Sequence, residues 1–149
     1  MNRHIVHNCV WFPIFLIGLA TLILGLVWIC HPEPWLLDQA PNEVLIKTTF
    51  ENLFSSDINK HLPTYLKVMY RFFGLWLGTI GLLILSYVRV TKLGTNKARS
   101  SIYSTLFITL LFLYYLMYKY LYVSPLFPLL HSLALLLTFS MYFSIQIKE

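Results

Sequence analysis

Four basic side chains lie within or beside long apolar stretches, and they are the residues of this sequence whose chemistry stands out. Arg71 and His131 lie inside apolar runs, whereas Lys67 and Lys119 lie near the ends of such runs. An ionisable group at membrane depth is a functional candidate, because lipid does not solvate it. A guanidinium or ammonium group would bind a carboxylate or an anionic head group, and an imidazole would accept or donate a proton.

These side chains suggest a ligand-binding or partner-binding group near the outer end of a helix bundle. Its members are Arg71, His131, Lys67, Tyr70 and Tyr118. Each member also has a structural explanation. The lysine would anchor its helix at the interface, the arginine would extend its head toward water, and the tyrosines would form an aromatic belt. The histidine would bond to a nearby carbonyl or hydroxyl. We favour the structural explanation for all of them except Arg71, for which the two explanations balance.

No recognised set of catalytic or metal-ligating residues is present. No acid lies in a long apolar run, so an acid-based proton relay is missing. Cys9 and Cys30 lie at opposite ends of the first run. A helix of that length would separate them by about 31 Å, whereas a disulfide needs Cα atoms within about 7 Å. A metal site formed by His31, His61 and His131 is disfavoured. We therefore predict no catalytic residue, no cofactor and no metal.

The composition is that of a membrane protein. Of 149 residues, 58% are hydrophobic and only 11% are charged, with a mean hydropathy of +0.68. A soluble domain carries about 25% charged residues. The pI near 9.3 raises the question of nucleic acid. The basic residues lie beside apolar runs instead of forming a soluble basic patch, so we expect the lipid bilayer, not nucleic acid, as the partner.

Four apolar runs are long enough to span a membrane. They cover about residues 10–29, 64–88, 101–122 and 125–147. The first run is longer than the core of a signal peptide and is not followed by a small-x-small cleavage site, so we expect it to remain as a span. Trp11 and Trp28 would anchor its two ends. The prediction is an all-α integral membrane four-helix bundle, with residues 1–149 forming one domain.

The segment of residues 31–62 is the longest stretch outside the predicted spans. Pro32, Pro34 and Pro41 disfavour a helix in its first part. Asn42 then begins a short amphipathic helix that ends near Ser55, with apolar side chains on one side and polar ones on the other. This helix would either pack on the bundle, which we favour, or lie on the membrane surface.

One face of the second predicted span is unusual. At about 100° per residue, six of its residues fall within a sector of about 80°. They are Lys67, Arg71, Gly74, Gly78, Gly81 and Leu85. Gly74 and Gly78 have the small-xxx-small spacing that allows another helix to approach closely. We therefore expect the glycines to mediate helix packing, and this span to be the central helix against which the others pack.

The charge of the loops predicts the orientation. Residues 89–100 form a short loop with four basic residues and no acid, in which Gly94-Thr-Asn96 would make the turn. Residues 31–62 carry five acids but only Lys47 and Lys60, a net charge of −3. The positive-inside rule places the basic loop and both termini in the cytoplasm, and residues 31–62 outside. A tight reversal at 123–125 makes the third and fourth spans antiparallel neighbours.

The layout resembles the small four-helix DoxX-like membrane proteins of bacteria. The shared features are four spans, an outer segment after the first, and a second span that opens with Arg71-Phe-Phe-Gly74 and has further glycines at 78 and 81. The resemblance implies the fold. The founding name of that group is linked to a quinone-dependent sulfur-oxidising complex. No cysteine pair, cofactor motif or acidic residue in the last span brings that activity to this chain.

Three functions were considered from these observations. The favoured one is a membrane protein without catalytic activity of its own, acting as an accessory or assembly component of a membrane complex, with other membrane subunits or further copies of the chain as partners. The second is a binder or carrier of a small amphiphile, a quinone or a lipid, in an outer-leaflet pocket. A membrane oxidoreductase subunit ranks lowest.

Overall fold

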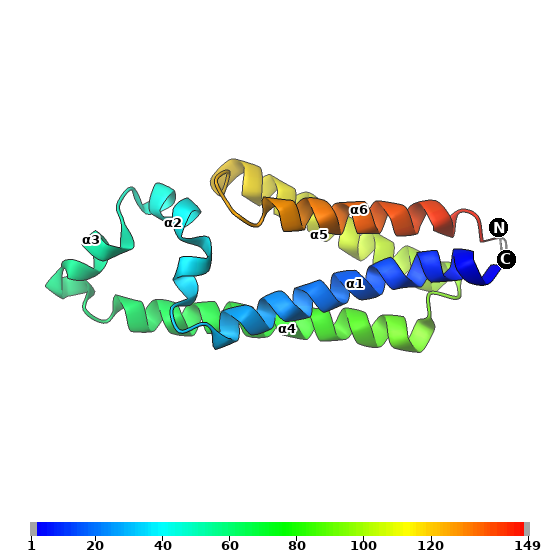
Figure 1. Cartoon of the computed structure of the whole chain (residues 1–149), viewed down its shortest axis with the longest axis horizontal. Coiled ribbons are helices and arrows are strands. Elements are labelled where there is room, and N and C mark those ends of the chain that lie inside the picture. The colour runs from blue at the N-terminus through cyan, green and yellow to red at the C-terminus, as the bar shows by residue number, and fades with distance from the viewer. Residues whose placement is uncertain (1–2, 148–149) are drawn as a thin grey trace.

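The computed structural model describes residues 3–147, which form an elongated set of helices (Figure 1). Its four long helices are α1 (Arg3–Cys30), α4 (Leu62–Thr91), α5 (Asn96–Tyr120) and α6 (Phe127–Ser144). The segment between α1 and α4 holds η1 (Pro34–Asp38), α2 (Gln39–Ile46), α3 (Phe50–Ser55) and η2 (Asp57–Asn59). The four long helices are long and apolar enough to cross a membrane. The predictions of an all-α chain and of four such helices are confirmed.

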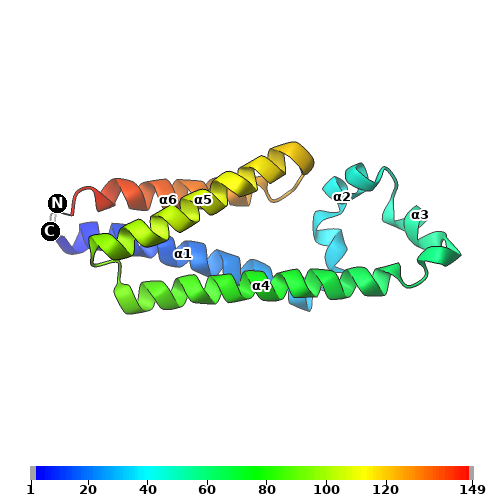
Figure 2. The ribbon, with the colours of Figure 1, turned by 180° about the vertical axis from the view of Figure 1, so that it is seen from behind.

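The central helix is α1, not α4. It packs along α4 on one side and along α6 on the other, and α5 packs on α6. Figure 1 shows α1 between α4 and α6, and Figure 2, the view from the opposite side, shows α5 crossing in front of α6. Among the four long helices, as far as the structure describes them, α4 makes extensive contact with α1 alone. The prediction of a central second span was therefore wrong. A glycine face accommodates one partner helix, whereas a central helix needs two contact faces.

The contact between α1 and α4 brings two backbones together. The glycines on the α4 side, all buried, are Gly74, Gly78 and Gly81. A Cβ added to Gly81 would lie 2.5 Å from the backbone nitrogen of Leu22, and one added to Gly74 would lie 2.7 Å from the carbonyl oxygen of Gly25. Only glycine leaves room for such an approach, so main-chain contact holds this helix pair together.

The other face of α1 packs on α6 and α5 through a buried polar chain. Ser140 on α6 is fully buried, and its hydroxyl donates to the carbonyl of Val10 on α1 at 2.6 Å. The Tyr103 hydroxyl on α5 lies 2.8 Å from the Ser140 Oγ. Because the serine proton is used on Val10, the tyrosine is the donor in that bond. One hydrogen-bonded chain thus links three helices, surrounded by apolar side chains that include Ile14 and Leu137.

The predicted single amphipathic helix is two helices, so that prediction was wrong. Lys47 follows α2 with a φ of 57°, and α3 begins anew with Thr49 as its cap, whose hydroxyl accepts from the Asn52 amide. The carboxylate of Glu43 accepts the Phe50 amide across the break. Pro41 did not prevent helix α2, because it lies in the first turn, where no backbone N–H is needed.

In the segment between α1 and α4, η1 makes the main contacts with these two helices. Trp35 of η1 is 5% exposed and packs edge-on against Phe54 of α3. The apolar side chains of Val44, Leu45 and Ile46 at the end of α2 are left exposed. The packing on the bundle that was expected of the amphipathic helix is therefore made mainly by η1.

The basic loop also differs from the prediction. Its turn is made by Lys92 and Leu93, with φ values of 48° and 53°, and no glycine among the described residues has a positive φ. Leu93 is fully buried and therefore holds the turn by packing. Arg99 is buried as well, and its guanidinium donates to the carbonyls of Leu93 and Gly94. This arginine stabilises the loop rather than adding to its exposed charge.

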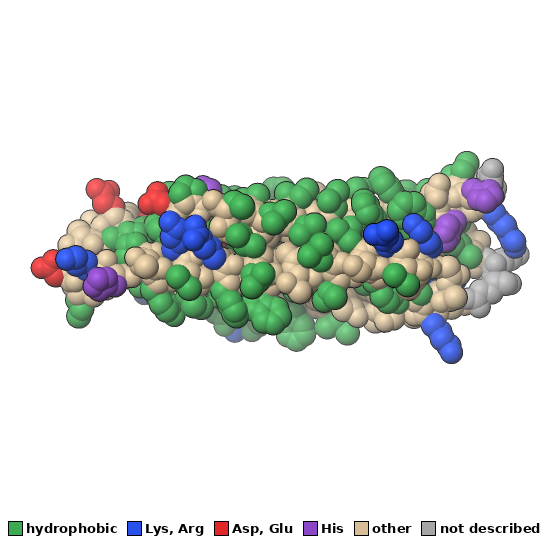
Figure 3. Space-filling model, turned by 90° about the horizontal axis from the view of Figure 1, so that it is seen from below, with side chains coloured by type: hydrophobic (Ala, Val, Ile, Leu, Met, Phe, Trp, Pro, Cys, Tyr) green, Lys and Arg blue, Asp and Glu red, His purple; other side chains and the backbone are tan. Residues whose placement is uncertain are grey.

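Charged side chains avoid the middle of the molecule. On the face drawn in Figure 3, lysines and arginines lie toward both ends, an uncharged middle separates them, and the acidic side chains gather at one end only. Hydrophobic side chains cover the middle. A surface of this kind suits a bilayer whose hydrocarbon layer is about 30 Å thick.

Candidate functional site

The residues proposed from the sequence as a binding group fall into two separate clusters. Tyr70 belongs to a junction of η1, α2 and α4, whereas Tyr118 and His131 lie near the reversal that joins α5 to α6. Within residues 3–147, no hydrogen bond or ring contact joins one cluster to the other. Arg71 and Lys67 belong to neither cluster.

Tyr70 is the best-connected of these residues. Its hydroxyl donates to a carboxylate oxygen of Asp38 at 2.9 Å and accepts from the side-chain amide of Asn42 at 2.7 Å. The same amide donates to the Asp38 carboxylate at 2.8 Å. The Tyr70 ring packs edge-on against Trp28 of α1, with ring centroids 5.9 Å apart. The triad of Asp38, Asn42 and Tyr70 therefore fixes the segment between α1 and α4 to this helix pair.

The electrostatics of this triad depend on Asp38. Burial raises the pKa of the Asp38 carboxyl above its ordinary value, and the hydrogen bonds from Tyr70 and Asn42 partly oppose that shift. Each donor stabilises the ionised form, whereas loss of water destabilises it. All three side chains bond to one another, so the triad acts as a clamp between η1, α2 and α4.

His131 and Tyr118 form an aromatic cluster at the reversal between α5 and α6. Its other members are Tyr114 and Phe127. The His131 ring lies edge-on to Tyr114 at 5.5 Å, and its Nδ1 lies 2.7 Å from the carbonyl oxygen of Phe127. A contact with a carbonyl requires the proton on Nδ1, so this nitrogen caps a carbonyl of its own helix. That geometry is the structural role considered for the histidine.

Arg71 lies on the surface of α4. Its side chain is exposed, and the structure gives it no hydrogen bond or ion pair with any residue between 3 and 147. The expectation that it points into the outer end of the bundle is therefore not met. Lys67, one turn earlier, is half-buried. Sequence spacing placed Arg71 within the 80° sector of the glycines, but α1 covers the glycines and Leu85 of that sector and does not cover Arg71.

Asp38 and Asn42 are the contributors that sequence reasoning missed. Asn42 was expected to cap a helix and Asp38 was counted only as an outer acid. Their spacing of four residues is a signal that the two side chains meet on one face of a helical segment. Nothing local indicates that Tyr70, 28 residues beyond Asn42, completes the group.

Compared with protein-family models, with curated proteins and with solved structures, the chain has no match.

Proposed function

We propose that this chain is a membrane protein without catalytic activity of its own that serves as an accessory or assembly component of a membrane complex. The observation that supports this most directly is Arg71. Its neighbours on the same face of α4, three residues before and four residues after it, are Val68 and Leu75, which are 61% and 56% exposed. A charged side chain flanked by exposed apolar side chains suits a contact with another membrane protein.

The charge of Arg71 requires a partner or water. Arginine stays protonated, and its planar fork fits a carboxylate. None of the four long helices contains an acid, and the Asp38 carboxylate near this level is bonded to Tyr70 and Asn42, so we infer that a carboxylate for Arg71 comes from another chain. Arg71 lies about 27 Å along the helix from Arg89, which is close to the hydrocarbon thickness of about 30 Å. A partner's acid near the outer boundary of the membrane would reach it.

The proposed orientation follows the charges. Residues 31–62 lie outside, and the basic loop and both ends of the chain lie in the cytoplasm. In the structure, the described ends of the chain and the basic loop lie at one end of the bundle and the outer segment lies at the other, an arrangement that supports the proposal (Figure 1). The resemblance to DoxX-like proteins remains part of this proposal, as a statement about architecture.

Native gel electrophoresis of gently solubilised membranes tests the function. We expect the wild type to migrate in an assembly, and Arg71→Lys to release it, because lysine keeps the charge but lacks the fork. Lys67→Arg is the matched control and should leave the assembly intact. Two differently tagged copies that co-purify would identify a homo-oligomer. A wild type that migrates alone, or an assembly that survives Arg71→Leu, would contradict the proposal.

The second hypothesis, an outer pocket for an amphiphile, depended on Arg71 and His131 lining one cavity. They belong to different helix pairs, and the His131 Nδ1 is engaged by its own helix. No observation at that end of the molecule favours this function over assembly.

A further inference from the structure

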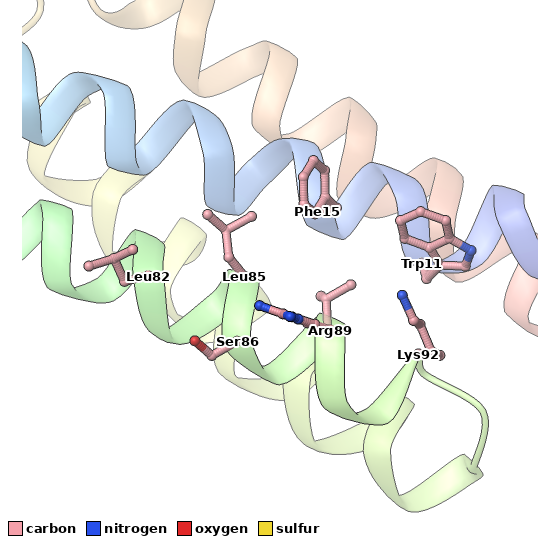
Figure 4. A pocket seen from close by; sticks show the side chains of 8 residues that line it. Trp11, Phe15, Leu82, Leu85, Ser86, Arg89 and Lys92 are labelled. Atoms are coloured by element: carbon pink, nitrogen blue, oxygen red, sulfur yellow. The ribbon is translucent and has the colours of Figure 1, made fainter.

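A groove opens between α1 and α4 at the opposite end of the molecule, beside the basic loop (Figure 4). Its volume is about 440 Å³, within the range of about 300–1,000 Å³ that small-molecule sites occupy. The lining residues on which the argument depends are Trp11, Phe15, Leu82, Leu85, Arg89 and Lys92. The groove forms because the glycine contact ends at Gly18 and Gly81, and the two helices diverge from there toward the loop.

The groove has an apolar body and a cationic end. Phe15, Leu82 and Leu85 line the part nearer the middle of the helices, Lys92 lies toward the loop, and the Arg89 side chain extends between these two parts with its head toward Leu85. The Lys92 ammonium lies 5.2 Å from the centre of the Trp11 ring, which holds it over the groove by a cation–π contact. Arg89 is exposed, and no acid is among the residues that line the groove.

These dimensions match part of a phospholipid. From Leu82 to Lys92 the helix rises about 15 Å, half of a hydrocarbon layer of about 30 Å. The cations therefore stand where the head groups of one leaflet lie, and the apolar walls stand where its acyl chains lie. Trp11, at the same level as Lys92, is a residue type that favours this interface.

We propose that the groove binds an anionic phospholipid, with its phosphate between Arg89 and Lys92 and one acyl chain along Phe15 and Leu85. Basic side chains at the membrane surface attract anionic lipids, and each one strengthens binding about fivefold. A soluble anion would gain nothing from the apolar wall, and a zwitterionic lipid would bring its own positive charge to the two cations. This site is independent of the assembly function proposed above, which rests on the outer end of α4.

Native mass spectrometry of the purified full-length protein tests the proposal. The protein is titrated in detergent with dioleoylphosphatidylglycerol, with dioleoylphosphatidylcholine, and with inorganic phosphate. We expect one phosphatidylglycerol to be retained in preference to the other two ligands. Removing both cations, by Arg89→Gln with Lys92→Gln, should weaken its binding roughly 25-fold. Lys97→Gln removes an exposed lysine of the same basic region that does not line the groove, and should change nothing.

A second pair of variants tests the apolar wall without changing the charge. Leu85→Trp fills the groove and should lower retention of phosphatidylglycerol, whereas Leu83→Trp, on an exposed face of α4, should not. Lipids brominated on their acyl chains should also quench the fluorescence of Trp11, which is identified as the part of the emission that Trp11→Phe removes. Brominated phosphatidylglycerol should quench this fluorescence more than brominated phosphatidylcholine does.

Three results would overturn the proposal. Equal retention of the two lipids would show general lipid contact, and binding of phosphate as tight as that of the lipid would show a soluble-anion site. An equal loss of phosphatidylglycerol binding in Lys97→Gln and in the double variant would show that lipid binding depends on overall charge alone. If the double variant does not fold, the tryptophan pair still decides, because equal retention by Leu85→Trp and Leu83→Trp would exclude the groove.

Discussion

The backbone nitrogen of Gly78 lies so close to Gly25 that a Cβ added to Gly25 would clash with it. A Cβ added to Gly25 would also lie 2.6 Å from the carbonyl oxygen of Gly74. The reverse does not hold, because a Cβ added to Gly78 would meet its nearest neighbour, the Leu22 side chain, at an ordinary 3.9 Å. The two glycines face each other, but only the one on α1 is essential for the approach of the backbones.

This asymmetry gives a sharp mutational prediction. Gly25→Ala should destabilise the helix pair by about 1–3 kcal/mol, because backbone atoms must move apart to admit the methyl group. Gly78→Ala should be tolerated, or should stabilise by up to about 1 kcal/mol through the better helix propensity of alanine. Thermal unfolding in detergent, followed by circular dichroism, measures both. Equal melting temperatures for the two variants would show that the helices do not meet at these glycines.

A larger side chain at position 78 tests the same contact. Leucine reaches beyond its Cβ toward Leu22, so Gly78→Leu should cost about 1–3 kcal/mol by overpacking. Thr79 is exposed on the same helix, so Thr79→Leu should lower the stability less. The same unfolding assay compares the two. A Gly78→Leu variant as stable as Thr79→Leu would mean that α1 does not cover this face.

The buried chain from Tyr103 through Ser140 to Val10 is expected to stabilise the other contact of α1. Ser140→Ala removes the donor to a buried carbonyl and should lower the free energy of unfolding by about 0.6–2 kcal/mol, the range found for hydrogen bonds between membrane helices. Ser132→Ala is the control, because the Ser132 hydroxyl is exposed and donates to the Pro128 carbonyl of its own helix. If both variants unfold alike, the buried chain contributes nothing specific.

The four long helices and one helix contact could be predicted from the sequence. Long apolar runs predicted the four long helices, because a stretch without charge has few alternatives. The positions of Gly74, Gly78 and Gly81 indicated where another helix approaches. Which helix is central could not be inferred, because the answer depends on Ser140 and Val10, two residues 130 positions apart in the sequence.

The turns and the candidate site were harder to predict for a different reason. The loop after α4 turns at Lys92 and Leu93 although a glycine follows, since Leu93 is held in the left-handed conformation by burial. Local propensity favours the glycine, and tertiary packing overrides it. Arg71 was assigned to the glycine face by angle alone. An angle does not show where the partner helix ends, and α1 does not cover Arg71.

The orientation in the membrane is open to direct measurement. In a background of Cys9→Ser and Cys30→Ser, single cysteines are introduced as Asp57→Cys and Lys97→Cys, both at exposed positions. A membrane-impermeant maleimide should label the first in intact cells and the second only after lysis, because the positive-inside rule places the basic loop in the cytoplasm. Labelling of position 97 in intact cells would reverse the proposed topology.

The outer segment should respond to pH through Asp38 and Glu43 in opposite directions. Burial raises the pKa of Asp38 from its ordinary value of 3.8, so the folded state binds its proton more tightly than the unfolded state does. Stability should therefore fall as the pH rises from 3.8 through the folded pKa of Asp38, and Asp38→Asn should remove that fall.

Hydrogen bonds from Gln39 and from the Phe50 amide lower the pKa of Glu43 from 4.5, so the stability that Glu43 contributes is present above pH 4.5 and is lost as the pH falls. The melting temperature of Asp38→Asn, measured against pH in detergent and compared with that of the wild type, separates the effect of Asp38 from that of Glu43. If the difference between the wild type and Asp38→Asn does not change with pH above 3.8, the Asp38 carboxyl is not buried in the clamp with Tyr70.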